Sequence, residues 1–103
     1  MRTKLSALLT LSFIIATPAF ASADLAAKKN CTTCHSASTK MLGPTWQDIA
    51  AKYKGQKGAD ATLADKIVKG GGGVWGPTPM PPNAAVSADD AKTLAKWALG
   101  GGQ

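Results

Sequence analysis

The two cysteines of this chain lie three residues apart, and its only histidine directly follows the second one. Together, Cys31, Cys34 and His35 form the sequence C-T-T-C-H. Residues three apart on a helical turn point to the same side, so both sulfur atoms can reach the vinyl groups of one porphyrin. The adjacent imidazole is then directed at the metal from beneath. This spacing is typical of covalent attachment of haem c through two thioether bonds, with the histidine as an axial iron ligand.

Three other uses of a cysteine pair fit the sequence less well. A thioredoxin-like dithiol follows a strand, whereas the residues before Cys31 have a helical pattern. A structural zinc site needs four ligands, and the chain has no second cysteine pair. A plain disulfide suits an exported protein but leaves the position of His35 unexplained. Haem attachment is therefore the interpretation that we adopt.

The N-terminal segment has the layout of a secretory signal peptide. Two basic residues precede an apolar stretch over residues 5–16, and small residues follow Pro18. This stretch is shorter than the roughly 20 apolar residues that a membrane-spanning helix needs. Cleavage can occur after Ala21 or Ala23, and we expect removal of residues 1–23. The sequence thus predicts Sec-dependent export to the periplasm of a Gram-negative bacterium, with no membrane span in the mature protein.

Residues 24–103 are predicted to form one small domain, and 80 residues can bury only a modest core. This segment has ten lysines, six aspartates and no arginine, so its net charge is +4. Because the lysines are scattered and no arginine can make bidentate contacts to phosphate or guanine, we do not expect nucleic acid as a partner. A basic surface suits docking of acidic proteins instead. We expect a monomer.

Four segments have helical periodicity, and none alternates as a strand does. The expected helices cover residues 24–35, 45–53, 60–70 and 87–101. The expected helix ends are the N-caps Thr45, Asp60 and Ser87 and the C-terminal stop Gly70. The expected buried faces are Trp46, Ile49, Ala50 and Tyr53; Leu63, Ala64, Ile67 and Val68; and Ala91, Leu94, Ala95 and Ala98. Trp46 and Trp97 are expected to be core residues. The predicted fold class is all-α, with three to four short helices packed around one covalently bound haem.

The second axial ligand decides what the iron can do, because an open position permits oxygen or peroxide chemistry and a filled one leaves electron transfer. With no further histidine, the candidates are Met41 and Met80. Met41 lies six residues after His35, so the backbone would have to round the porphyrin edge within that length. Met80 lies in a loop rich in glycine and proline, residues 70–85. We expect Met80 to bind the iron. The mature chain has no distal histidine or arginine to cleave peroxide, so a peroxidase or gas sensor ranks below an electron carrier.

The sequence resembles the short bacterial class I cytochromes c, the monohaem c-551 and c-552 group, over essentially all of residues 24–103. The shared stretches are C-T-T-C-H, K-M-L-G-P and G-V-W-G-P-T-P-M-P-P-N. The resemblance implies a non-enzymatic, low-spin one-electron carrier of a periplasmic respiratory chain. Implied partners are a cytochrome bc complex as donor and a terminal oxidase, nitrite reductase or peroxidase as acceptor.

The resemblance also implies roles for four residues around the haem. The backbone carbonyl of Pro44 would accept a hydrogen bond from the imidazole of His35. Trp75 would donate to a haem propionate, and Lys66 would neutralise that propionate where relatives often have arginine. Asn83 would lie near the methionine sulfur.

Overall fold

The structure is a computed structural model that describes residues 10–14 and 18–103. It contains four α-helices and one 3-10 turn, in the order α1 (Pro18–Lys28), η1 (Cys31–Thr33), α2 (Trp46–Tyr53), α3 (Ala59–Lys69) and α4 (Ala88–Leu99). Within these described ranges the only strand-like pairing is an isolated antiparallel bridge between Gly71 and Met80. The all-α class predicted from the sequence is therefore confirmed.

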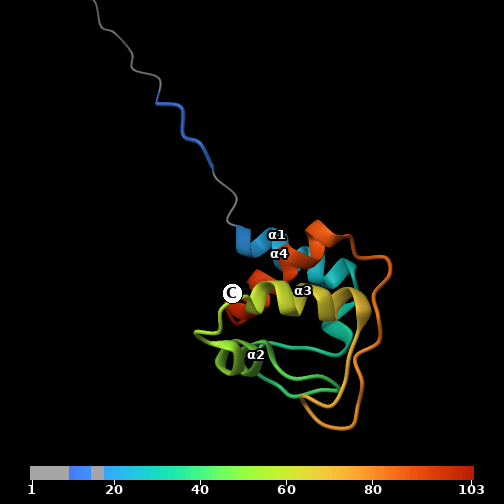
Figure 1. The fold of residues 1–103 in the computed structure, drawn as a ribbon. Coiled ribbons are helices and arrows are strands. Elements are labelled where there is room, and N and C mark those ends of the chain that lie inside the picture. Colours follow the sequence, from blue (N-terminus) through green and yellow to red (C-terminus); the bar gives the residue numbers. More distant parts are fainter. Residues whose placement is uncertain (1–9, 15–17) are drawn as a thin grey trace, which may run out of the picture.

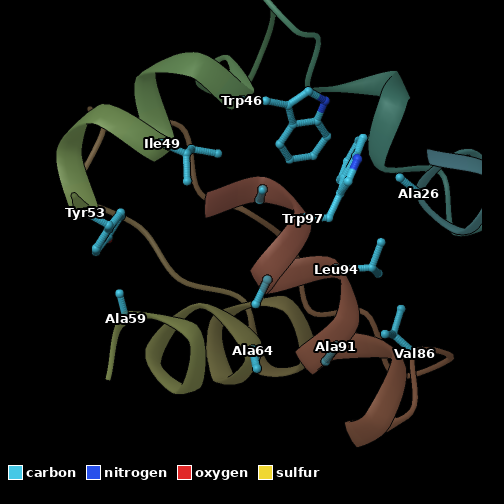
Figure 2. Close-up of a cluster of buried hydrophobic side chains, with 12 residues drawn as sticks. Ala26, Trp46, Ile49, Tyr53, Ala59, Ala64, Val86, Ala91, Leu94 and Trp97 are labelled. Carbon is cyan, nitrogen blue, oxygen red and sulfur yellow. The ribbon is translucent and has the colours of Figure 1, made fainter. Parts of the chain in front are cut away.

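Helix α4 is the central element and contacts each of the other three helices. In Figure 1, α1 lies beside α4 at the top of the molecule. Figure 2, in which the ribbon has the colours of Figure 1, shows α4 between α2 and α3, and α4 contacts both. The expected inward face of α4, Ala91, Leu94, Ala95 and Ala98, is buried as predicted, together with Trp97. Figure 2 shows Trp97 between Trp46 of α2 and Ala26 of α1. The helices are thus held together mainly through α4.

The core that these helices enclose is small. Six of its twelve buried apolar residues are alanine, and no large side chain in the described part of the chain is fully buried. Alanine lets helices approach closely but removes little apolar surface from water. The helices therefore need a further apolar partner, and the cavity described below provides the place for one.

Two helices begin at the caps that the sequence predicts. The backbone N–H of Asp48 donates to Oγ1 of Thr45 at 3.0 Å. At the start of α4, the N–H of Asp90 donates to Oγ of Ser87 at 3.1 Å. Each side-chain oxygen satisfies one N–H group that has no partner within its helix.

The prediction of Asp60 as the N-cap of α3 was wrong. Helix α3 begins at Ala59, and its N-cap is Gly58, whose φ of 74° is in the left-handed region. Glycine adopts this conformation without a Cβ penalty, so the chain turns into the helix before Asp60. The predicted stop is present, because the N–H of Gly70 donates to the carbonyl of Lys66 after the last turn.

The prediction of one continuous helix over residues 24–35 was also wrong. Helix α1 ends at Lys28, and Asn30 has φ 62° and ψ 19°. Asparagine tolerates this left-handed conformation better than most residues, and it separates α1 from the 3-10 turn that carries the first cysteine. The helix also begins earlier than predicted, at Pro18 rather than Asp24. Of the predicted signal peptide, residues 1–23, the structure describes residues 10–14 and 18–23, and the rest lies outside the described residues. No helix in the described ranges has the length and apolar character needed to cross a membrane.

Candidate functional site

A cavity of about 400 Å³ lies between η1, α2, α3, α4 and the loop that follows α3. Its wall contains all four predicted haem-binding side chains, Cys31, Cys34, His35 and Met80. Most of the remaining wall is apolar, including Ile49, Leu63, Ile67, Val74 and Leu94. The cavity thus combines a few metal-binding and thiol groups with a large apolar surface.

The cysteine motif forms a tight turn at one edge of this cavity. The N–H groups of Cys34 and His35 both donate to the carbonyl oxygen of Cys31, at 3.2 and 3.0 Å. Both cysteines are half-buried free thiols. Burial raises the pKa of the Cys31 thiol above its ordinary value, because desolvation disfavours the thiolate. Two thiols on one turn can each add to a vinyl group of the same porphyrin and form a thioether.

The imidazole of His35 is buried and points one ring nitrogen at the backbone. Its Nδ1 lies 2.7 Å from the carbonyl oxygen of Pro44. A carbonyl can only accept, so Nδ1 carries the proton and Nε2 keeps its lone pair for a metal. The ring thus points Nδ1 at the backbone and leaves Nε2 as the nitrogen that can bind a metal.

Two further contacts fix this ring, and sequence reasoning did not assign either residue to the site. The indole of Trp46 stacks on it, with ring centroids 4.7 Å apart and planes 27° apart. A Cβ at Gly43 would lie 2.5 Å from its Cε1 atom, so no side chain fits at that position. The sequence placed Trp46 on a buried helix face, but periodicity does not reveal which residue it meets.

The loop after α3 carries Met80 to the cavity. The backbone groups of Met80 and Gly71 exchange two hydrogen bonds, at 2.7 and 3.0 Å. A Cβ at Gly70 would lie 2.5 Å from the carbonyl oxygen of Met80, so the close approach of these two segments requires glycine. Met80 is half-buried and lines the cavity, whereas Met41 is 45% exposed and does not.

Of the other three side chains predicted for the site, two line the cavity and one does not. Lys66 and Trp75 line the cavity, and Trp75 is 41% exposed. Asn83 does not line it. Its Nδ2 donates to the carbonyl oxygens of Ile67 and Pro81, at 2.9 and 3.4 Å. Asn83 therefore fastens the end of the loop to the last turn of α3.

These residues fit a covalently bound haem. The two thiols, Nε2 of His35 and the thioether of Met80 are the kinds of group that attach and ligate a c-type haem. The glycines at positions 43 and 70 keep the approaches to His35 and Met80 clear. An apolar cavity of this kind suits the faces of a porphyrin better than it suits water.

A small all-α fold with a C-x-x-C-H turn and a methionine loop at one apolar cavity defines a c-type cytochrome. The chain belongs to the cytochrome c family, because the profile of the family Cytochrome c matches residues 21–99. Accordingly, this is a short class I cytochrome c with one covalent haem c, and a small electron carrier. The sequence-based predictions of family and cofactor are confirmed.

Individual relatives agree with this family. The chain is 61% identical over 71 residues to cytochrome c-551 of Pseudomonas aeruginosa, covering 69% of this chain and 67% of the relative. It is 52% identical over 88 residues to cytochrome c-552 of Nitrosomonas europaea, covering 85% of each. The crystal structure of wild-type Nitrosomonas europaea cytochrome c552 superposes with a TM-score of 0.74 at 55% identity, covering 76% of this chain and 96% of that one. A class 1 cytochrome, MtoD from Sideroxydans lithotrophicus ES-1, superposes with a TM-score of 0.68 at 25% identity, covering 85% and 100%.

Proposed function

We propose that this protein is an exported one-electron carrier whose haem iron is bound by Nε2 of His35 and the sulfur of Met80. One observation carries the proposal: both side chains line the cavity that also contains both cysteines, while Met41 lies outside it. When bound, haem c supplies the one-electron chemistry. The protein holds both ligands in place and excludes water.

The surroundings of His35 and Met80 favour fast electron transfer. They also favour a higher reduction potential than that of a solvated haem with two nitrogen ligands. The hydrogen bond from His35 to Pro44 fixes the tautomer and strengthens imidazole donation. A thioether ligand favours the ferrous state, and apolar walls disfavour the extra positive charge of the ferric state. If His35 and Met80 bind the iron in both oxidation states, little would need to move when an electron arrives.

Three residues complete the proposed site. Trp75 and Lys66, both in the cavity wall, would bind a haem propionate through an indole N–H and an ammonium group. Lysine can neutralise the carboxylate but lacks the bidentate geometry of arginine. Asn83 would act on the methionine indirectly, because the hydrogen bond from its side chain to the carbonyl oxygen of Ile67 holds the loop on α3.

The absorption spectrum of the ferric protein tests the ligand assignment. A band in the far red reports methionine bound to ferric haem iron. We expect this band in the natural protein and in Met41→Ala, and we expect Met80→Ala to lose it. Loss of the band in Met41→Ala with retention in Met80→Ala would reverse the assignment, and its absence from the natural protein would refute His/Met ligation.

We also propose that residues 1–23 are a signal peptide and that residues 24–103 are the mature periplasmic domain. The basic start, apolar stretch and small residues before Asp24 support this assignment. The mass of protein from the periplasm of a Gram-negative host tests it. We expect residues 24–103 plus one haem. A mass that includes residues 22 and 23 would move the cleavage site to Ala21, and an uncleaved cytoplasmic product would contradict export.

A further inference from the structure

The methionine loop, which we define as residues 71–80, is fastened to the rest of the chain mainly at its base. Gly71 and Met80 close the base through their two backbone hydrogen bonds. Just beyond this base the two arms of the loop lie close together, since a Cβ at Gly72 would lie 3.5 Å from Pro79. From residue 72 to residue 79, no backbone hydrogen bond joins the loop to the rest of the described chain. Its tip therefore depends on side-chain contacts rather than on backbone hydrogen bonds.

One such contact connects the tip to a helix at another wall of the cavity. The Nζ atom of Lys52, in the last turn of α2, lies 5.4 Å from the centroid of the Trp75 ring. This distance is within the range of a cation–π interaction, and an indole is the best aromatic partner for it. Trp75 lies about midway along the loop, so the contact acts where the backbone has no support.

Another lysine, Lys66, lies near the loop and lines the cavity, but it acts at a different point of the loop. Lys66 of α3 lies at the base, where its Nζ would be 3.6 Å from a Cβ at Gly71. The base is already held by the bridge to Met80. Lys52, by contrast, joins α2 to the tip of the loop through the Trp75 ring. The exposed Lys54 caps the same end of α2. Its substitution therefore removes the same charge as substitution of Lys52 but leaves the contact with Trp75 in place, which makes it a control.

We propose that Lys52 is a positioning residue that holds the methionine loop closed over the cavity through the indole face of Trp75. Closure of the loop keeps the sulfur of Met80 at its binding position and slows its departure from the iron. This inference rests on the proposed ligation of the iron by Met80. An exposed cation–π contact of this kind corresponds to a change of about two- to fivefold in the population of the open loop.

Binding of added imidazole to the ferric holoprotein measures this opening, because imidazole can reach the iron only after Met80 leaves it. Loss of the far-red band gives the rate and the apparent affinity. We expect Lys52→Gln to bind imidazole about two- to fivefold faster than the natural protein. Lys52→Arg, which keeps a cation over the indole, should match the natural protein. Lys54→Gln, which removes the same charge from the same helix end, should match it as well.

A double-mutant cycle with Trp75→Leu shows whether Lys52 acts through the indole. We expect Lys52→Gln to add no acceleration in that background. The inference is overturned if Lys52→Gln equals the natural protein, if Lys54→Gln accelerates binding equally, or if Lys52→Gln still accelerates it beside Trp75→Leu. Should Trp75→Leu not fold, the comparison of Lys52→Gln, Lys52→Arg and Lys54→Gln decides alone. Absence of the far-red band from the natural protein would instead refute the proposed ligation, so the two failures are distinguishable.

Discussion

The imidazole of His35 and the indole of Trp46 lie stacked, with centroids 4.7 Å apart and planes 27° apart. Trp46 in turn meets Trp97 edge to face, with centroids 4.9 Å apart. Through Trp97 the stack reaches α4, the helix that contacts all the others. His35, the proposed iron ligand, is thus connected directly to the centre of the core. Disturbance of this aromatic row should affect the stability of the fold and the order of the ligand together.

Replacement of Trp46 tests the contribution of the stack. Trp46→Ala removes a buried aromatic side chain and should lower the free energy of unfolding by about 3–5 kcal/mol. Trp46→Phe keeps an aromatic face toward His35 and should lose much less. Denaturant unfolding of the ferric holoprotein measures both values. Gln47→Ala, an exposed change on the same helical turn, should stay within about 0.5 kcal/mol. Equal losses in Trp46→Phe and Trp46→Ala would argue against stacking.

Gly43 limits the His35 ring from another direction. Gly43→Ala would place a Cβ 2.5 Å from Cε1 of His35, so the ring or the backbone must shift. Such overpacking should destabilise the holoprotein by about 1–3 kcal/mol, which thermal unfolding can measure. Gly72→Ala is a suitable control, because its Cβ would meet only ordinary contacts at 3.5 Å. If both alanines are tolerated equally, the ring has more freedom than the structure indicates.

Periodicity and capping residues predicted most of the fold. The buried stripe of α4 and the caps at Thr45 and Ser87 follow from local sequence alone, because each depends on residues within one or two turns. The end of α1 and the start of α3 did not follow, since Asn30 and Gly58 both adopt positive φ. One residue in this conformation redirects the chain whatever the helix propensity of its neighbours.

The candidate site likewise contains residues that local sequence identifies and residues that only the folded chain brings together. Cys31, Cys34 and His35 are recognisable because they share one turn. The neighbours of the ring are not recognisable, because Trp46 and Gly43 reach it only when residues 36–46 fold back on the motif. The backbone bond from Gly43 to Cys34 and the bond from Trp46 to Ser36 record this return. The contact between Lys52 and Trp75 likewise depends on tertiary structure.

Removal of the haem should unfold most of the chain. A core in which six of twelve buried residues are alanine cannot offset the conformational entropy of some 80 residues. We expect Cys31→Ala/Cys34→Ala protein to have weak helical circular dichroism and no cooperative melting transition, unlike the holoprotein. A helical double variant that melts cooperatively would show that the four helices are sufficient.

The salt dependence of the oxidation rate should distinguish electrostatic steering of the oxidant by lysines near the cavity from the effect of the net charge of the protein. Lys40 is exposed in the cavity wall next to the cysteine motif, and Lys92 is exposed on α4 outside it. Oxidation of the ferrous protein by ferricyanide, an anion, should slow as ionic strength rises from about 0.01 to 0.1 M, because the Debye length falls from about 30 to about 10 Å. At low salt, Lys40→Gln should reduce the rate about twofold, and Lys92→Gln, with the same net charge, should reduce it less. A rate that is independent of salt, or equal losses in the two variants, would rule out local steering at this edge of the cavity.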